Sequence, residues 1–169
     1  MTSKVNKMKK DAAIFAAGCF WGVQYYFDQV PGVLQTTAGY IGGHVDHPSY
    51  ELVCSHTTGH AEAVKIVFDD KTVSYEILLK QFFRMHDPTQ LNRQGPDIGD
   101  NYRSSIFYLD NGQKVEAQKV IDELNKTKFN GKIVTTLEKA STFWPAEDYH
   151  QKYTERTGRG MCHVDYKSV

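Results

Sequence analysis

Near the start of the chain a short apolar run passes directly into a helical pattern, and this junction is the feature that most constrains the fold. Residues 12–17 (Ala-Ala-Ile-Phe-Ala-Ala) are typical of a short buried strand, and apolar residues recur at helical spacing over 19–29. Gly18 stands between them, and glycine permits a sharp turn from strand to helix. We therefore predict that Cys19, the next residue, lies in the first turn of a helix.

The position of Cys19 allows two interpretations. Unsatisfied backbone N–H groups and the positive end of the helix dipole favour a thiolate over a thiol at a helix start, which predicts a reactive cysteine. A Cys within apolar sequence is, however, most often a buried structural residue. The junction alone does not decide between the two.

Length and charge restrict the class of protein. The chain has 169 residues, enough for one domain, which we expect over 1–169, with a core at about 12–153 and a flexible tail at about 154–169. Twenty basic residues balance twenty acidic ones, so no net charge favours nucleic acid or an anionic membrane. No apolar segment is long enough for a signal peptide or a membrane span, so we expect a cytoplasmic protein.

Cys19, Cys54 and Cys162 are too few and too dispersed for a disulfide scaffold. In a reducing compartment a cysteine pair is more plausibly transient and catalytic than structural. Cys162 lies in an aperiodic segment with two nearby glycines, from which a thiol can reach another sulfur. The alternative for Cys162 is an incidental terminal cysteine.

Periodicity and turn signals predict alternating strands and helices. The expected strands are 12–17, 33–40, 61–69, 103–110 and 133–138. The expected helices are 19–29, a helix that runs from its N-cap Ser74 to about residue 86, 113–126 and 145–153. Ile77, Leu78, Phe82 and Met85 are expected to face inward on one helix, and Val115, Ala117, Val120, Ile121 and Leu124 to share one side of another. This order predicts an α+β sandwich, with a mixed sheet of the ferredoxin-like, split βαβ kind and helices on its faces.

Two long loops, 41–60 and 87–102, are expected to form the walls of a site. Tyr50 and Tyr102 each lie near the end of one loop and could donate a phenolic hydrogen bond, although a packed tyrosine ring is the simpler explanation for each. Asp97 lies in the second loop, where a turn-forming role is the alternative to ligand binding.

Glu62 lies at the start of the predicted strand 61–69. Alternation places it on the same face as Val64, Ile66 and Phe68, and therefore toward the apolar side. Burial raises the pKa of a carboxyl group, and a neutral carboxyl group can donate a hydrogen bond or a proton to a developing oxyanion. The alternative is an exposed carboxylate at the strand end.

A metal site is weakly indicated by Cys54, His56 and His60, but no second group of ligands completes a tetrahedral set. His150 could orient a thiolate as in Cys/His hydrolases, without any supporting spacing.

Several segments taken together resemble one family. The pattern of the A-type peptide-methionine (S)-sulfoxide reductases is matched, in order, by Gly-Cys-Phe-Trp-Gly at 18–22, Gly-Tyr-Ile-Gly-Gly at 39–43, Tyr-Glu-Leu-Val-Cys-Ser at 50–55, Thr-Gly-His-Ala-Glu at 58–62, His-Asp-Pro-Thr at 86–89, Gln-Gly-Pro-Asp-Ile-Gly at 94–99, Asn-Tyr-Arg-Ser-Ser at 101–105 and Ala-Glu-Asp-Tyr-His-Gln at 146–151. The resemblance covers residues 12–162 and implies an α+β sandwich with a ferredoxin-like core.

The resemblance implies that the Cys19 thiolate attacks the sulfur of the S epimer of methionine sulfoxide, free or in proteins. Glu62 would hydrogen-bond or protonate the sulfoxide oxygen, with assistance from Tyr50 and Tyr102. The reaction leaves Cys19 as a sulfenic acid. By the same resemblance Cys162 is the resolving cysteine, and thioredoxin reduces the resulting disulfide.

The substrate pocket follows from the same comparison. Phe20 and Trp21 would surround the methionine methyl group, and Asp97 would hold the backbone amide of the substrate. The family pattern implies no cofactor and no metal, and nothing in the sequence demands more than a monomer. Cys54 matches a position without a required role, and we interpret it as buried and inert.

The sequence departs from the family pattern in two places. His56 replaces the usual glycine, and Asp100-Asn101 replaces the commoner Thr-Gln. Two other classes of function remain as alternatives: a thiol peroxidase or cysteine hydrolase, for which no partner groups are indicated near Cys19, and a metal- or redox-sensing module that uses Cys54, His56 and His60.

Overall fold

The computed structural model describes residues 8–161. Its strands are β1 (Lys10–Ala17), β2 (Val33–Ile41), β3 (Ala61–Asp69), β4 (Arg93–Gln94), β5 (Asp97–Ile98), β6 (Ser104–Tyr108), β7 (Thr136–Lys139) and β8 (Trp144–Pro145). Its α-helices are α1 (Phe20–Asp28), α2 (Tyr50–Cys54), α3 (Tyr75–Met85), α4 (Asn111–Thr127) and α5 (Tyr153–Thr157), and two 3-10 turns are η1 (Asp100–Tyr102) and η2 (Asp148–His150).

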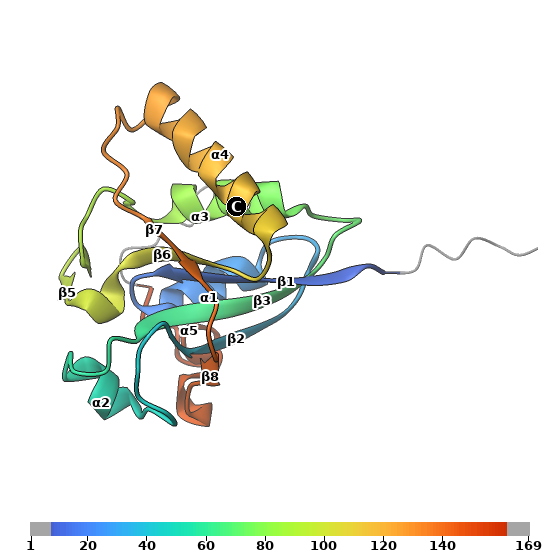
Figure 1. The fold of residues 1–169 in the computed structure, drawn as a ribbon. Coiled ribbons are helices and arrows are strands. Elements are labelled where there is room, and N and C mark those ends of the chain that lie inside the picture. The colour runs from blue at the N-terminus through green and yellow to red at the C-terminus, as the bar shows by residue number, and fades with distance from the viewer. Residues whose placement is uncertain (1–7, 162–169) are drawn as a thin grey trace, which may run out of the picture.

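Six strands form one sheet in the order β7-β6-β1-β3-β2-β8, and β4 and β5 form a separate hairpin. The four central strands, β6, β1, β3 and β2, are antiparallel to one another, while β7 is parallel to β6, so the sheet is mixed. With α1 between β1 and β2 and α3 between β3 and β6, the order β6-β1-β3-β2 is that of a split βαβ, ferredoxin-like core. The predicted α+β fold is therefore confirmed (Figure 1).

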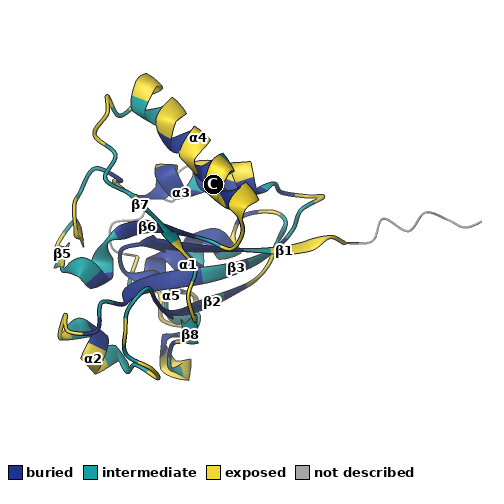
Figure 2. Cartoon of the chain, in the orientation of Figure 1, coloured by how far each residue is buried: buried dark blue, intermediate teal, exposed yellow. Residues whose placement is uncertain are grey.

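The two faces of the sheet are packed differently. On β1, Ala13, Phe15 and Ala17 belong to the main core, which also contains the inner faces of α1, α3 and α4. Ile14 and Ala16 point to the opposite face and join a smaller cluster. Figure 2 shows the central strands almost entirely buried and the outer side of α4 exposed. Since the main core lies under α1, it holds the start of that helix firmly against the sheet.

Both edges of the sheet are short. At one edge β7 has four residues, Thr136–Lys139, and at the other β8 has only two, Trp144 and Pro145. Proline has no backbone N–H and cannot donate to a further strand. Because β8 pairs only with Gly39 and Tyr40, residues 33–37 of β2 have a strand partner on one side only.

Two apolar helix residues are more exposed than their neighbours in the predicted patterns. Ile77 on α3, predicted to face inward, is 46% exposed, and Val115 on α4, predicted to share one side with Ala117, Val120, Ile121 and Leu124, is 60% exposed. The buried stripe of α3 follows Tyr75, Leu78, Leu79, Phe82 and Phe83, and Ile77 lies to one side of this i, i+3, i+4 pattern. The Ser74 cap is confirmed, because its Oγ accepts a hydrogen bond from the Ile77 backbone N–H at 3.1 Å.

The loop 41–60 contains a helix that the periodicity did not predict. The Ser49 Oγ accepts a hydrogen bond from the Leu52 N–H at 3.2 Å and starts α2, which is too short to show an apolar repeat. The predicted helix 145–153 is wrong: Pro145 belongs to β8, and α5 begins only at Tyr153. Across residues 8–161 the structure contains no helix with the length and apolar character to cross a membrane.

Candidate active site

Cys19 lies at the junction of β1 and α1, as the sequence predicted. β1 ends at Ala17, Gly18 has a φ of +89°, and Cys19 is the N-cap residue of α1. The left-handed φ is one that glycine adopts without strain, which explains the residue type before the cysteine. Cys19 is 8% exposed, so its thiol lies in a sheltered position at the positive end of the helix.

Glu62 reaches the same helix start from β3. It pairs with Tyr40 of β2 in the sheet register and is 1% exposed, which confirms that it faces the apolar side of the strand. Its Oε1 accepts a hydrogen bond from the Phe20 backbone N–H at 3.2 Å. Because Phe20 directly follows Cys19, the carboxyl group of Glu62 lies next to the cysteine.

Tyr50 and Tyr102 bring the two long loops to this point. Tyr50 begins α2 and Tyr102 ends η1, and both are half-buried. Burial, and secondly the nearby charge of Glu62, raises the pKa of both phenols well above the usual tyrosine value. Both side chains therefore remain protonated at neutral pH and are able to donate hydrogen bonds.

Tyr102 is the point at which the predicted site residues meet. After burial and Glu62, the groups whose charges raise the pKa of Tyr102 are Cys54, Asp97 and Cys19. Asp97 comes from β5 of the small hairpin and is half-buried. The structure thus places Cys19, Glu62 and Asp97 near one phenol, together with Cys54, which had been interpreted as inert.

Cys54 lies within this group of residues, which corrects its interpretation as a buried residue. It is half-buried on α2, four residues after Tyr50 and hence on the same face of the helix. Burial raises the pKa of its thiol, and hydrogen bonds with the hydroxyl groups of Tyr50 and Tyr102 oppose that shift only in part. Cys54 is therefore held as a thiol between the two phenols.

Phe20 and Trp21 form an aromatic wall beside the cysteine. Phe20 is 1% exposed, and its ring lies 5.1 Å from that of His150 and 6.4 Å from that of Tyr50 between centroids. Trp21 is half-buried and stacks on Tyr153, with centroids 4.0 Å apart. The more exposed of the two rings is therefore supported from the C-terminal part of the chain.

His150 supports Trp21 and was not predicted to do so. Its Nδ1 accepts a hydrogen bond from the indole N–H of Trp21 at 2.8 Å, so the proton of the neutral ring is on Nε2. The ring is fully buried, and burial lowers the pKa of His150. A neutral imidazole that anchors an indole has a role different from the thiolate-orienting one considered from the sequence.

Glu147 fixes the position of Tyr50. One carboxylate oxygen accepts a hydrogen bond from the Tyr50 backbone N–H at 3.0 Å, and the other from the Tyr40 hydroxyl at 2.8 Å. Burial alone would raise the pKa of Glu147, but these hydrogen bonds outweigh it and the net pKa is lowered. The carboxylate is thus charged at neutral pH and holds the start of α2. The only sequence signal for it was the shared segment 146–151, which assigns no role.

The structure argues against a metal site at Cys54, His56 and His60. His60 accepts a hydrogen bond from the Gly43 N–H at its Nδ1 (3.0 Å) and bonds the Val45 carbonyl through its Nε2 (2.7 Å), so both ring nitrogens are engaged. Within residues 8–161, His, Cys, Asp and Glu side chains form no group of three that could hold a metal ion.

The two departures from the family pattern meet in space. His56 has a φ of +63°, a conformation that favours the glycine usual in the pattern. Its Nδ1 lies 3.9 Å from Oδ1 of Asp100, so the loop after α2 contacts η1. Cys162 lies outside the described residues.

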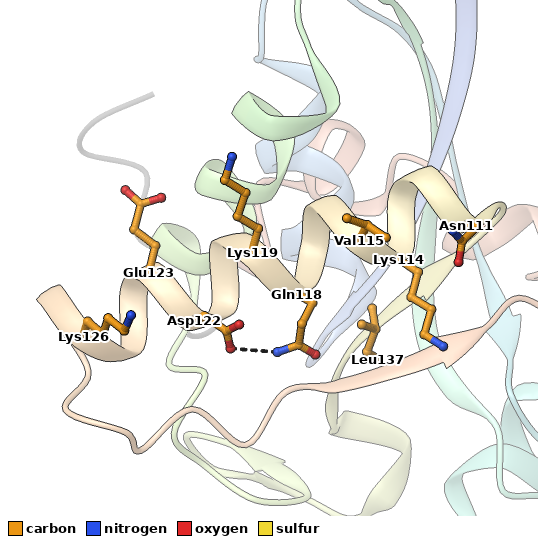
Figure 3. Close-up of a pocket in the computed structure, with 9 residues that line it drawn as sticks. All are labelled: Asn111, Lys114, Val115, Gln118, Lys119, Asp122, Glu123, Lys126 and Leu137. Atoms are coloured by element: carbon orange, nitrogen blue, oxygen red, sulfur yellow. Dashed lines mark hydrogen bonds between the residues drawn. The ribbon is translucent and has the colours of Figure 1, made fainter.

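A surface hollow of about 800 Å³ lies away from this site, along α4 (Figure 3). None of the candidate site residues lines it, and five of its nine lining residues are charged. Two of its lining side chains are joined by a hydrogen bond, which Gln118 Nε2 donates to Asp122 Oδ1 at 2.8 Å. Its lining residues are Asn111, Lys114, Val115, Gln118, Lys119, Asp122, Glu123, Lys126 and Leu137.

The fold and this group of residues define an α+β protein with a thiol, a carboxyl group and two protonated phenols at one helix start. Residues 11–169 match the family model described as peptide methionine sulfoxide reductase. The chain is 52% identical over 153 residues to the peptide methionine sulfoxide reductase MsrA of Geobacter sulfurreducens, covering 90% of this chain and 94% of the relative. The chain therefore belongs to the peptide methionine sulfoxide reductase family.

Solved structures agree with this assignment. The reduced form of Mxr1 from Saccharomyces cerevisiae superposes with a TM-score of 0.85 at 32% identity, covering 92% of each chain. Methionine sulfoxide reductase A of Corynebacterium diphtheriae gives a TM-score of 0.85 at 30% identity, covering 95% of this chain and 81% of that one.

Proposed function

We propose that this protein reduces the S epimer of methionine sulfoxide, in proteins and as the free amino acid, with thioredoxin as the reductant. The single observation that carries the proposal is the hydrogen bond from Phe20 N–H to Glu62, which brings a buried carboxyl group beside Cys19. The family assignment supports the reaction class, and the site supplies the chemical groups that such a reaction requires.

In the first step the sulfur of Cys19 attacks the sulfoxide sulfur. Glu62 donates a proton or hydrogen bond to the sulfoxide oxygen, and Tyr50 and Tyr102 donate further hydrogen bonds. The attack forms an S–S bond between Cys19 and the substrate. This bond and the S–O bond then break, as the hydroxyl group passes to the Cys19 sulfur and the thioether leaves. The sulfoxide is reduced by two electrons, Cys19 is oxidised by two electrons to a sulfenic acid, and the proton released by the Cys19 thiol replaces the one that Glu62 gave to the oxygen.

The pocket selects methionine by shape and by one polar contact. Phe20 and Trp21 receive the methyl group of the substrate, an assignment supported by their position directly after Cys19. Asp97 binds the backbone amide of the substrate, which its half-buried position beside Tyr102 favours. Because these contacts are on one side of the sulfur, only one epimer presents its oxygen to Glu62.

The second step restores the cysteine. The thiol of Cys162 attacks the sulfenic acid of Cys19, a disulfide forms and water leaves. A thioredoxin then reduces the disulfide to two thiols by exchange. Mxr1, the yeast relative, has been solved in complex with Trx2, which supports this choice of partner. We further propose that residues 1–169 act as one domain, with the tail from about 154 serving this step, and that the protein works as a cytoplasmic monomer.

The test is a steady-state assay on the separated S and R epimers of a blocked methionine sulfoxide, with thioredoxin, thioredoxin reductase and NADPH. We expect turnover of the S epimer only, and none with Cys19→Ser. Equal rates for both epimers would refute the proposed selection of the S epimer by the pocket, and activity in Cys19→Ser would refute the role of Cys19 as the nucleophile. With hydrogen peroxide in place of the sulfoxide, a thiol peroxidase would instead show the faster oxidation of NADPH.

A further inference from the structure

The C-terminal segment returns to the site at Gly160. Helix α5 ends at Thr157, and Gly158 follows with a φ of +70° and donates its N–H to the Thr154 carbonyl at 2.8 Å. Gly160 also has a left-handed φ, +77°. The last described residues of the chain therefore turn twice within three positions.

Gly160 lies directly against Trp21. A Cβ atom placed on Gly160 would come within 2.9 Å of Cε3 and 3.2 Å of Cβ of Trp21, and within 3.3 Å of the Thr154 hydroxyl oxygen. The first distance is shorter than carbon atoms tolerate, so only glycine allows the backbone to lie this close to the indole. Gly158 differs in this respect, because a Cβ there would have no atom within 4 Å.

The same segment makes three contacts that support the indole. His150 accepts the hydrogen bond from the indole N–H, Tyr153 stacks on the ring, and Gly160 covers the edge near Cε3. Trp21 is thus both the proposed wall of the methionine pocket and the surface on which this segment lies. The two roles share one side chain, two residues from Cys19.

We propose that Gly160 is a positioning residue for the resolving step: its bare Cα lets the C-terminal segment lie against Trp21 and so holds the chain that leads to Cys162 close to Cys19. The inference rests on the proposed function, since it assumes that Cys162 resolves the sulfenic acid. Cys162 follows Gly160 by two residues, which span at most about 7 Å of chain. Holding one end of so short a piece raises the effective concentration of the thiol at the Cys19 sulfur.

The pair Gly160→Ala and Gly158→Ala isolates the contact. Both variants place alanine at a left-handed φ, but only the first forces a methyl group into Trp21. Each protein is mixed with one equivalent of the S sulfoxide and quenched over time, and mass spectrometry counts the Cys19–Cys162 disulfide and the dimedone-trapped sulfenic acid. Dithiothreitol-driven and thioredoxin-driven turnover are measured in parallel, with thermal unfolding as a check on folding.

We expect disulfide formation in Gly160→Ala to be roughly tenfold slower than in Gly158→Ala, because overpacking against Trp21 moves the segment away from this position. The sulfenic acid should accumulate, while turnover with dithiothreitol stays within about twofold of that of the parent. Equal rates of disulfide formation in the two variants would overturn the proposal. A loss of dithiothreitol-driven turnover in Gly160→Ala as large as its loss in disulfide formation would also overturn it, because the contact would then serve the methionine pocket and not the resolving step. A failure of the proposed function itself would show earlier, as a parent protein that forms no disulfide after the sulfoxide is added.

Discussion

Replacement of Glu62 by glutamine and by alanine separates its two proposed contributions. In the structure its Oε1 accepts the Phe20 N–H at 3.2 Å in a site that is almost completely buried. A glutamine side chain has the same length, so its carbonyl oxygen can accept from Phe20 and its amide can donate to the sulfoxide oxygen. It cannot transfer a proton. Alanine removes the acceptor, the donor and the proton together.

The magnitudes follow from these losses. Proton transfer by a positioned side chain contributes about 10²- to 10⁴-fold to a rate, so Glu62→Gln should lose about 10²-fold in kcat at the lower end of that range. Losing a hydrogen bond to the developing oxyanion costs a further 10²- to 10³-fold or so, which places Glu62→Ala at a loss of about 10⁴-fold. The buried Phe20 N–H is also left without this acceptor in the alanine variant, which should lower its free energy of unfolding by about 1–3 kcal/mol.

The assay is single-turnover formation of methionine from the S sulfoxide at saturating substrate, with urea unfolding of each variant at the same pH. Restricting it to one turnover excludes effects on the resolving step. The glutamine variant should retain about 10²-fold more activity than the alanine variant and unfold close to the parent. Equal rates in the two variants would refute the hydrogen-bonding role of Glu62, and full activity of Glu62→Gln would refute proton transfer by Glu62.

Three further results are expected. Cys162→Ser should complete one turnover and cycle with dithiothreitol but stop with thioredoxin; normal thioredoxin cycling would disprove its role. His150, neutral in the folded protein because burial lowers its pKa, is protonated in the unfolded chain below about pH 6.5. Stability should therefore fall with decreasing pH below 6.5 by up to about 1.4 kcal/mol per pH unit, and urea unfolding should show a smaller slope for His150→Gln. Glu147→Gln weakens the charged acceptor of the Tyr50 N–H, so kcat/KM should fall severalfold. When Tyr50 is already replaced by phenylalanine, the added Glu147→Gln change should have little further effect on kcat/KM; additive losses would show that Glu147 acts elsewhere.

The sequence predicted those parts of the site that depend on local periodicity. Alternation along β3 placed Glu62 on the buried face, and the change from strand to helix placed Cys19 at a helix start. Both statements concern a residue and its near neighbours in the chain. Such relations are set by backbone geometry and do not require knowledge of the rest of the fold.

The parts that were missed depend on contacts between distant segments. The hydrogen bond from Trp21 to His150 joins residues 129 positions apart, and no pattern around either residue indicates the other. The position of Cys54 was missed for a related reason: α2 is a single short helix, and the Cys54 side chain contacts Tyr102 of η1, from another part of the chain. Ile77 shows the converse error, in which an apolar residue was assigned inward although the helical stripe passes beside it.

The short borders of the sheet have a consequence for a protein proposed to handle oxidised, damaged polypeptides. Such substrates expose loose backbone that can add to any open strand and begin co-aggregation. Here the terminal strands are β7, with four residues, and β8, which ends at Pro145. Outside the two residues that β8 covers, only residues 33–37 of β2 leave a border to which a strand of an unfolded client could be added, and we expect any such contact to occur there.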